Sequence, residues 1–280
     1  MTWDFKLVDG PYGGTCEGPA WDGTGLLFTH IPSSRILRYD PERNVSSIYL
    51  KETHHANGLI FDSQGMLYAC EGGTRRVVRY SSDGVKVIAD AFKQKCLNIP
   101  NDLAIDDQGR VWFTDPYYEG AAGSWSYDIS HKELDHDSVY RLESNSDGIW
   151  RIKRATFDTS RPNGLLFSTD NRTLYVAESG RRADEKRQLR AYPVQDDGTL
   201  GEYLILYDFG VYRGIDGMVL DTEGNIIATA GSSEGGPGPM IYVFSPSGDI
   251  IDTHPVIEDK PTNCSFGGSD LKTLYVTTSA

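Results

Sequence analysis

The sequence predicts an all-β protein folded as a six-bladed β-propeller. Short apolar runs are separated by turn residues, for example at 26–29, 76–80 and 240–244. Thirty glycines and sixteen tyrosines suit strands and tight turns, and no long segment has the apolar stripe of an amphipathic helix. One sequence pattern also recurs along the chain, and repeats of about 40 to 50 residues with several strands each are typical of propeller blades.

Each copy of the repeat has a polar residue, a small residue, a short apolar strand, a turn and a second apolar strand. The six copies begin at Glu17, Asn57, Asn101, Asn163, Asp216 and Asn263, at intervals of 40, 44, 62, 53 and 47 residues. Third strands follow most copies, at 36–39, 77–80, 139–142, 189–192 and 241–244. Six copies therefore predict six blades.

The sixth copy shows only two strands before the end of the chain. We expect the segment Phe5–Val8 to supply an outer strand and to close the ring, which would remove free sheet edges. No linker or shift in composition divides the sequence, so residues 1–280 are interpreted as a single propeller domain. The interval after the third copy carries an insertion from Pro116 to Asp137, rich in Tyr, Trp, Gly and charged residues, which we expect over one face. A solvated surface loop is the alternative.

Charge and composition exclude several classes of protein. Lys and Arg number 27 and Asp and Glu 40, so the formal net charge is −13, which argues against binding of nucleic acid or anionic membranes. The four cysteines, Cys16, Cys70, Cys96 and Cys264, lack metal-binding spacing, and we expect buried free thiols in a reducing compartment. No apolar run approaches a membrane span, and no signal peptide precedes the repeats, so we expect a cytoplasmic protein.

The first residues of the six repeats are the candidate site. The innermost strands of a propeller line its central axis, so equivalent positions converge in one ring, here two carboxylates and four amides. Oxygen donors with a formal charge of −2 favour a hard divalent cation, Ca²⁺ before Mg²⁺. The alternative is a turn, since Asn-Gly is a strong hairpin signal. A turn explains Asn57-Gly58 and Asn163-Gly164, but it does not explain Glu17-Gly18, Asn101-Asp102 or Asn263-Cys264.

The residues resemble the SMP-30/gluconolactonase family over nearly the whole chain, from about Glu17 to Thr278. The most specific segments are 16–21 (Cys-Glu-Gly-Pro-Ala-Trp), 100–102 (Pro-Asn-Asp), 161–165 (Arg-Pro-Asn-Gly-Leu), 214–218 (Gly-Ile-Asp-Gly-Met) and 261–268 (Pro-Thr-Asn-Cys-Ser-Phe-Gly-Gly). The resemblance implies a six-bladed propeller that includes sugar lactonases among its members. It also implies one central divalent cation, usually Ca²⁺, with Zn²⁺, Mn²⁺ or Mg²⁺ as alternatives.

By the same resemblance, the metal ligands fall on Glu17, Asn163 and Asp216, with Asn101 as a fourth, and Asp216 is the general base that activates water. Animal members similar to regucalcin carry an Arg at the position of Ile99, so that contact to sugar is absent here. We expect substrate contacts from Asn57, Asn101, Asn263, Tyr117, Tyr118 and Glu119.

Three function classes follow. The first is a Ca²⁺-dependent lactonase acting on a small sugar lactone such as gluconolactone. The second is a related Ca²⁺-dependent hydrolase of phosphotriesters or other esters, because phosphoryl and acyl centres both place negative charge on an oxygen that a metal can stabilise. The third is a non-catalytic propeller that binds calcium or a metabolite, since the fold alone does not fix the function.

Overall fold

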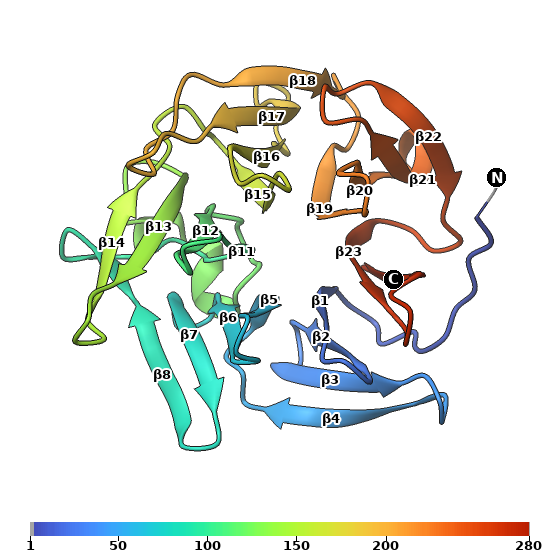
Figure 1. Ribbon diagram of the computed structural model, residues 1–280, viewed down its shortest axis with the longest axis horizontal. Coiled ribbons are helices and arrows are strands. Elements are labelled where there is room, and N and C mark those ends of the chain that lie inside the picture. Colours follow the sequence, from blue (N-terminus) through green and yellow to red (C-terminus); the bar gives the residue numbers. More distant parts are fainter. Residues whose placement is uncertain (1–2, 280) are drawn as a thin grey trace.

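The computed structural model describes residues 3–279 as antiparallel β-sheets arranged around a central axis (Figure 1). Five sheets have four strands each, and the strands of each sheet follow one another in chain order from the axis outward. The innermost strands contact their neighbours around the ring, and β23 lies between β19 and β1. The prediction of an all-β propeller is confirmed.

The strand bounds follow the sequence repeats. The first blade comprises β1 (Cys16–Trp21), β2 (Leu26–His30), β3 (Arg35–Asp40) and β4 (Val45–Lys51). The second comprises β5 (Ala56–Phe61), β6 (Leu67–Glu71), β7 (Arg76–Ser81) and β8 (Gly84–Ala89). The third comprises β11 (Leu103–Ile105), β12 (Val111–Asp115), β13 (Ser138–Ser144) and β14 (Trp150–Arg154).

The fourth blade comprises β15 (Pro162–Phe167), β16 (Thr173–Ser179), β17 (Arg187–Pro193) and β18 (Leu204–Asp208). The fifth comprises β19 (Ile215–Leu220), β20 (Ile226–Ser232), β21 (Gly235–Phe244) and β22 (Ile250–Pro255). Outside these blades lie the sheet of β23 (Pro261–Gly267) and β24 (Thr273–Thr278), the hairpin of β9 (Ala91–Phe92) and β10 (Lys95–Cys96), and two 3₁₀ turns, η1 (Ser124–Tyr127) and η2 (Ile129–His131).

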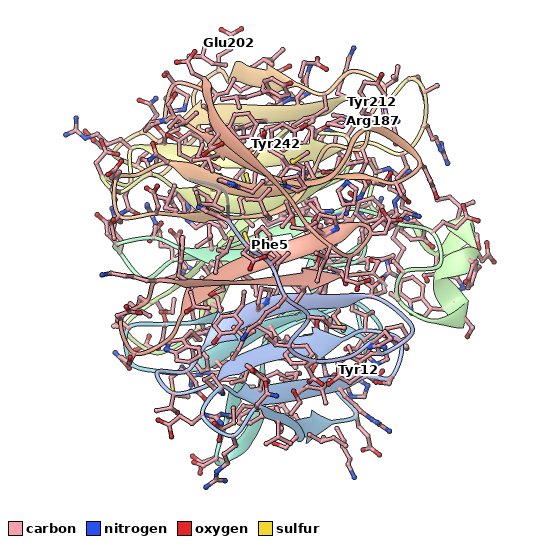
Figure 2. The ribbon with its side chains drawn as sticks, turned by 90° about the vertical axis from the view of Figure 1, so that its right-hand side faces the viewer. Phe5, Tyr12, Arg187, Glu202, Tyr212 and Tyr242 are labelled. Carbon is pink, nitrogen blue, oxygen red and sulfur yellow. The ribbon has the colours of Figure 1, made fainter. Side chains whose placement is uncertain are left out.

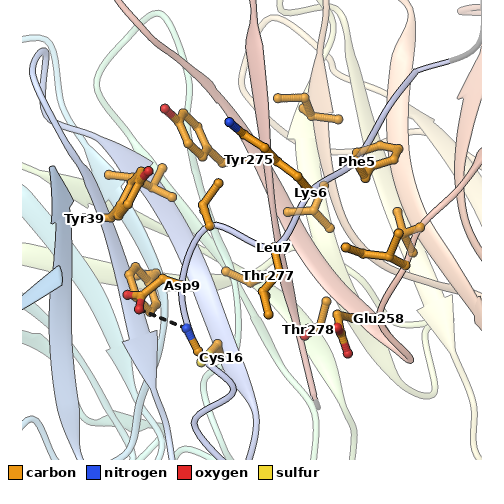
Figure 3. Close-up of a pocket in the computed structure, with 18 of the residues that line it drawn as sticks. Phe5, Lys6, Leu7, Asp9, Cys16, Tyr39, Glu258, Tyr275, Thr277 and Thr278 are labelled. Atoms are coloured by element: carbon orange, nitrogen blue, oxygen red, sulfur yellow. Dashed lines mark hydrogen bonds between the residues drawn. The ribbon is translucent and has the colours of Figure 1, made fainter. Parts of the chain in front are cut away.

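The predicted number of blades is wrong. The structure has five four-stranded blades, and the sixth repeat forms only the two-stranded sheet of β23 and β24. The predicted closing strand at Phe5–Val8 is also wrong, because residues 3–15 form no strand. The N-terminal segment passes along β24 without pairing with it, since a groove of about 250 Å³ separates the two (Figure 3).

Apolar packing, rather than strand pairing, attaches the N-terminal segment to the ring. Phe5 and Trp3 pack against the buried cluster that includes Ile241 and Cys264. The Trp3 ring also stacks on His254, with ring centres 4.0 Å apart. In Figure 3, Phe5, Lys6 and Leu7 follow one edge of the groove, and Tyr275 and Thr277 of β24 lie beside it. The sixth sheet therefore keeps an apolar groove along β24.

The hydrophobic core lies between the faces of neighbouring blades. One cluster joins the fourth and fifth blades through residues such as Leu189, Ile226 and Phe244. Another joins the second and third blades through Val77 and Phe113. Because alternate residues of a strand point to opposite faces, each middle strand contributes to two such clusters, and the ring axis is left to polar side chains.

Glycines after the first residues of four repeats allow the inner strands to approach one another closely. A Cβ atom on Gly58 would lie 2.6 Å from Asp102 Oδ1, and one on Gly164 would lie 2.5 Å from the carbonyl oxygen of Asp216. A Cβ atom on Gly18 would overlap the carbonyl oxygen of Asn57. Close packing around the axis, rather than a hairpin turn, therefore explains these glycines.

We predict that Gly18→Ala destabilises the protein more than Gly65→Ala. Both glycines have positive φ, 53° and 77°, so both substitutions place alanine in the left-handed region at a cost of about 1–2 kcal/mol. Only Gly18 also faces a neighbouring strand, since nothing lies within 4 Å of a Cβ at Gly65. Overpacking should add about 1–3 kcal/mol, measured by urea unfolding. Equal losses of stability in the two variants would contradict the close approach of β1 and β5.

Candidate active site

A cleft of about 1200 Å³ opens at one end of the central channel. Strand residues of the first, second, fourth and fifth blades line it, together with Asn101 just before β11 and with Lys260 and Ser279 at the ends of the sixth sheet. The structure brings together five of the six predicted ring residues on the surface of this cleft: Glu17, Asn57, Asn101, Asn163 and Asp216. Each side chain comes from the innermost strand of its blade or from the residues just before that strand. The convergence of the repeats thus places two carboxylates and three amides in one cavity.

β-Bulges orient several of these ring residues. The pairing of β5 with β6 shifts register between Ala56 and Leu59, on either side of Asn57. Similar shifts occur on either side of Asn163 in β15 and of Asp216 in β19. A bulge interrupts the regular alternation and redirects a side chain, which is why bulges occur next to active sites. Here the bulges let polar side chains face the axis, although the other residues of the same strands point alternately to the two faces of the blade.

Glu17 lies close to two other carboxylates, those of Asp216 and Asp102. Its side chain is buried, and the backbone N–H of Gly18 donates a hydrogen bond to Oε2 at 2.9 Å. Burial raises the pKa of Glu17 well above its usual value, and the nearby carboxylates of Asp216 and Asp102 raise it further. Carboxylates gathered in this way favour a bound cation, because a positive charge stabilises their ionised forms.

Asp216 is paired with an arginine that the sequence analysis missed. Burial raises the pKa of Asp216, while the positive charges of Arg213 and Arg181 act in the opposite direction. Arg213 Nη2 donates a hydrogen bond to Asp216 Oδ2 at 2.5 Å, and Nη1 donates to the carbonyl oxygens of Gly231 and Pro261, each at 3.0 Å. Arg213 stands only three residues before Asp216 in the sequence, and this short spacing between opposite charges could have indicated the ion pair.

Asp102 is a further carboxylate near Glu17 and Asp216, and it is buried, but the sequence analysis did not select it. It occupies the position at which four other repeats carry glycine, and burial raises its pKa to about 7. Asn263 Nδ2 donates to Asp102 Oδ2 at 3.3 Å. Asn263, which was expected to contact substrate, is buried and does not line the cleft. It lies behind the site, where it supports Asp102.

The insertion covers part of the cleft, and its residues differ in their placement. Gly120, Ser124 and Tyr127 line the cavity, and so does Tyr118, whose hydroxyl accepts a hydrogen bond from Asn163 Nδ2 at 3.4 Å. Figure 2 shows η1 and η2 projecting from the side of the molecule on which Arg187 and Tyr212 also lie.

Two predicted contacts in the insertion do not reach the cleft. Tyr117 is buried inside the insertion, where its hydroxyl donates to the carbonyl oxygen of Asp128 at 2.8 Å and its ring packs against Trp125. Glu119 is exposed and is not among the residues that line the cleft. Of the three consecutive residues predicted as substrate contacts, the structure therefore brings only Tyr118 to the site.

The donor atoms around the axis suit a hard divalent cation. Within residues 3–279, no three His, Cys, Asp or Glu side chains are arranged as a metal cluster, so a cation would also need amide oxygens. Among residues 3–279, Asn57 Oδ1 is buried and has no hydrogen-bond partner, which leaves an amide oxygen free to act as a ligand or to orient a bound molecule. Carboxylate and amide oxygens are the ligands that Ca²⁺ prefers.

Two other expectations concern thiols and membrane spans. Cys16, Cys70 and Cys264 are buried free thiols as predicted, but Cys96 is exposed because it lies on the short hairpin outside the blades. His55 lines the cleft, and its Nδ1 lies 2.9 Å from the carbonyl oxygen of Ile31. In the part of the chain from 3 to 279, no helix has the length and hydropathy needed to span a membrane.

Comparison with known proteins identifies the family. Residues 15–280 match the model of the SMP-30/Gluconolactonase/LRE-like region. A gluconolactonase of Zymomonas mobilis is 32% identical, over 94% of this chain and 76% of that protein, and regucalcin of Xenopus laevis is 28% identical, over 93% and 82%. The structure of a gluconolactonase from Xanthomonas campestris superposes with a TM-score of 0.79 at 28% identity, covering 95% of this chain and 84% of that one.

We predict that Asn263→Ala lowers stability rather than altering substrate affinity. The substitution leaves the buried Asp102 carboxylate without its amide donor, which should cost about 1–3 kcal/mol. The matched control is Asn225→Ala, because Asn225 donates to Asp221 at 2.9 Å in a partly exposed turn where water can replace the amide. The free energy of unfolding of both variants is measured by urea unfolding in the presence of a chelator. A rise in KM without loss of stability would show instead that Asn263 contacts substrate.

Proposed function

Because this chain belongs to the SMP-30/gluconolactonase/LRE-like family, we propose that it is a divalent-cation-dependent lactonase that hydrolyses a small sugar lactone such as gluconolactone. The main support is the convergence of buried and half-buried carboxylates and amides in one cleft. Two of the similar proteins named above are themselves gluconolactonases. A cleft of this kind can enclose a small polar substrate with its reacting carbonyl beside the ring of side chains.

We propose that Glu17, Asn163 and Asp216 hold the cation, with Asn101 as a fourth ligand and Ca²⁺ as the expected metal. All four residues line the same cavity, and all four supply oxygen donors. When bound, a divalent cation supplies Lewis acidity at a carbonyl oxygen and positive charge beside the carboxylates. Zn²⁺, Mn²⁺ and Mg²⁺ are the alternatives to be tested.

Asp216 is the general base of this proposal. Hydrolysis requires that a water oxygen bond to the lactone carbonyl carbon, that the ring C–O bond break, and that one proton pass from water to the departing ring oxygen. Arg213 engages Oδ2 of Asp216 and favours its ionised form, which leaves the second carboxylate oxygen to accept the proton. Asn57 and Tyr118 line the cleft, and in this proposal they orient the substrate.

A substrate panel tests the function directly. Purified protein, with and without EDTA and then with added Ca²⁺, is assayed against aldonolactones, aryl esters and a phosphotriester. Metal-dependent lactone opening supports the proposal. Turnover of only the phosphotriester or the aryl ester would assign the related hydrolase activity instead, and Ca²⁺ binding without turnover of any substrate would assign a binding protein.

We predict that Asp216→Asn lowers kcat at saturating Ca²⁺ by about 10²- to 10⁴-fold, because an amide cannot accept the proton from water. Metal affinity should fall less than turnover, since one oxygen donor remains. Asp221→Asn, in the turn after β19, is the control for a carboxylate-to-amide change outside the cleft. The measurement is kcat over a Ca²⁺ titration. Recovery of wild-type kcat at high Ca²⁺ would show that Asp216 is only a ligand.

A further inference from the structure

Positive charge in the cleft is confined to one wall. The residues lining the cleft from the fourth, fifth and sixth sheets and from the loops beside them include Arg181, Arg187, Arg213 and Lys260. The lining residues from the first three blades and the insertion include no Lys or Arg. This wall is unexpected in a chain with a formal net charge of −13.

Two of the four cations are neutralised by carboxylates. Arg213 pairs with Asp216, and Lys260 Nζ lies 2.9 Å from Glu234 Oε1. Arg187 is buried, and its guanidinium donates to backbone carbonyl oxygens, including that of Arg182 at 2.9 Å. Arg187 therefore contributes a positive charge to this wall, although its N–H groups already donate to backbone carbonyl oxygens.

Arg181 differs from an ordinary surface arginine because its surroundings fix its position. Its backbone N–H donates to Glu185 Oε2 at 2.7 Å, and the same oxygen accepts from the N–H of Arg182 at 3.0 Å. Its guanidinium carbon lies 4.3 Å from the centre of the Tyr118 ring. Across residues 3–279, no carboxylate lies within ion-pair distance of Arg181.

The position of Arg181 relates it to the proposed reaction centre. The hydroxyl of Tyr118, the ring beneath Arg181, accepts a hydrogen bond from Asn163, one of the proposed metal ligands. The side chain of Arg181 is largely exposed, and it lines the cleft. A molecule with its carbonyl beside Asn163 and Asp216 can therefore extend past Tyr118 to an unpaired guanidinium.

We infer that Arg181 forms a subsite for an anionic substituent of the substrate: a carboxylate, phosphate or sulfonate carried on the lactone away from its reacting carbonyl. This inference rests on the proposed lactonase function. A guanidinium presents paired N–H donors that match the oxygens of such groups, and charge-assisted hydrogen bonds of this type are stronger than neutral ones. Arg187 adds a second positive charge to the same wall, whereas the opposite wall suits the neutral part of a sugar.

The test compares substrates that differ in charge. We would measure kcat/KM for glucono-1,5-lactone, 6-phosphoglucono-1,5-lactone and glucaro-1,4-lactone with the wild type, Arg181→Gln and Arg182→Gln. Arg182 is the matched control, because it is adjacent and exposed but does not line the cleft. We expect Arg181→Gln to lower kcat/KM for the anionic lactones by roughly 10-fold or more beyond its effect on the neutral lactone, which reports only the influence of the Arg181 charge on Asp216. Arg182→Gln should change neither.

A binding measurement separates this inference from the proposed function. Calorimetry with 6-phosphogluconate, glucarate and gluconate, with and without Ca²⁺, requires no turnover. Loss of binding of the anionic hexose derivatives in Arg181→Gln, in a protein that opens no lactone, would support the subsite and overturn the lactonase. Equal effects of Arg181→Gln on neutral and anionic molecules would overturn the subsite while leaving lactonase activity intact. Comparing the phosphate with the second carboxylate identifies the preferred anion.

Discussion

Carboxylates are buried where the inner strands meet, and the hydrogen bonds and strand geometry around the axis have to accommodate their charge. Glu17 and Asp102 are buried, and each lies close enough to Asp216 for the negative charges to raise their pKa values. Burying ionised groups is costly unless each is paired or hydrogen-bonded. The donors that surround them, such as Arg213 and Asn263, reduce this cost in part, and a divalent cation would reduce it further.

The scaffold accommodates this polar centre by keeping its apolar packing elsewhere. The core clusters lie between blade faces, so the axis need not contribute hydrophobic stability. Glycines such as Gly58 and Gly164 let inner strands approach, and bulges turn the preceding asparagines toward the axis. The sixth sheet completes the ring with only two strands, and Trp3 and Phe5 pack against the apolar cluster that includes Cys264 of β23.

The cleft combines an acidic floor with a basic wall, and the two parts suit different portions of one molecule. Carboxylates at the floor favour a cation and can accept a proton, whereas the guanidinium of Arg181 can hold an anion near the opening. Arg213 belongs to both parts, since it stands in the wall and engages Asp216. The Arg213–Asp216 ion pair at the floor carries no net charge, whereas Arg181 near the opening has no carboxylate partner in residues 3–279. The charge of the substrate would therefore affect its affinity more than the chemical step.

The amino-acid sequence was enough to infer the all-β repeat, the family and the convergence of Glu17, Asn101, Asn163 and Asp216, because equivalent positions of a cyclic repeat must meet at its axis. The other side chains near these residues could be identified only in the folded chain. Asp102 and Arg181 come from a glycine position and from a loop between strands, so no repeat pattern marks them. The two strands of the sixth copy were visible in the sequence, but the failure of the N-terminal segment to pair with them was not. Strand pairing requires backbone groups to come within hydrogen-bond distance, and apolar packing holds this segment across a groove from β24.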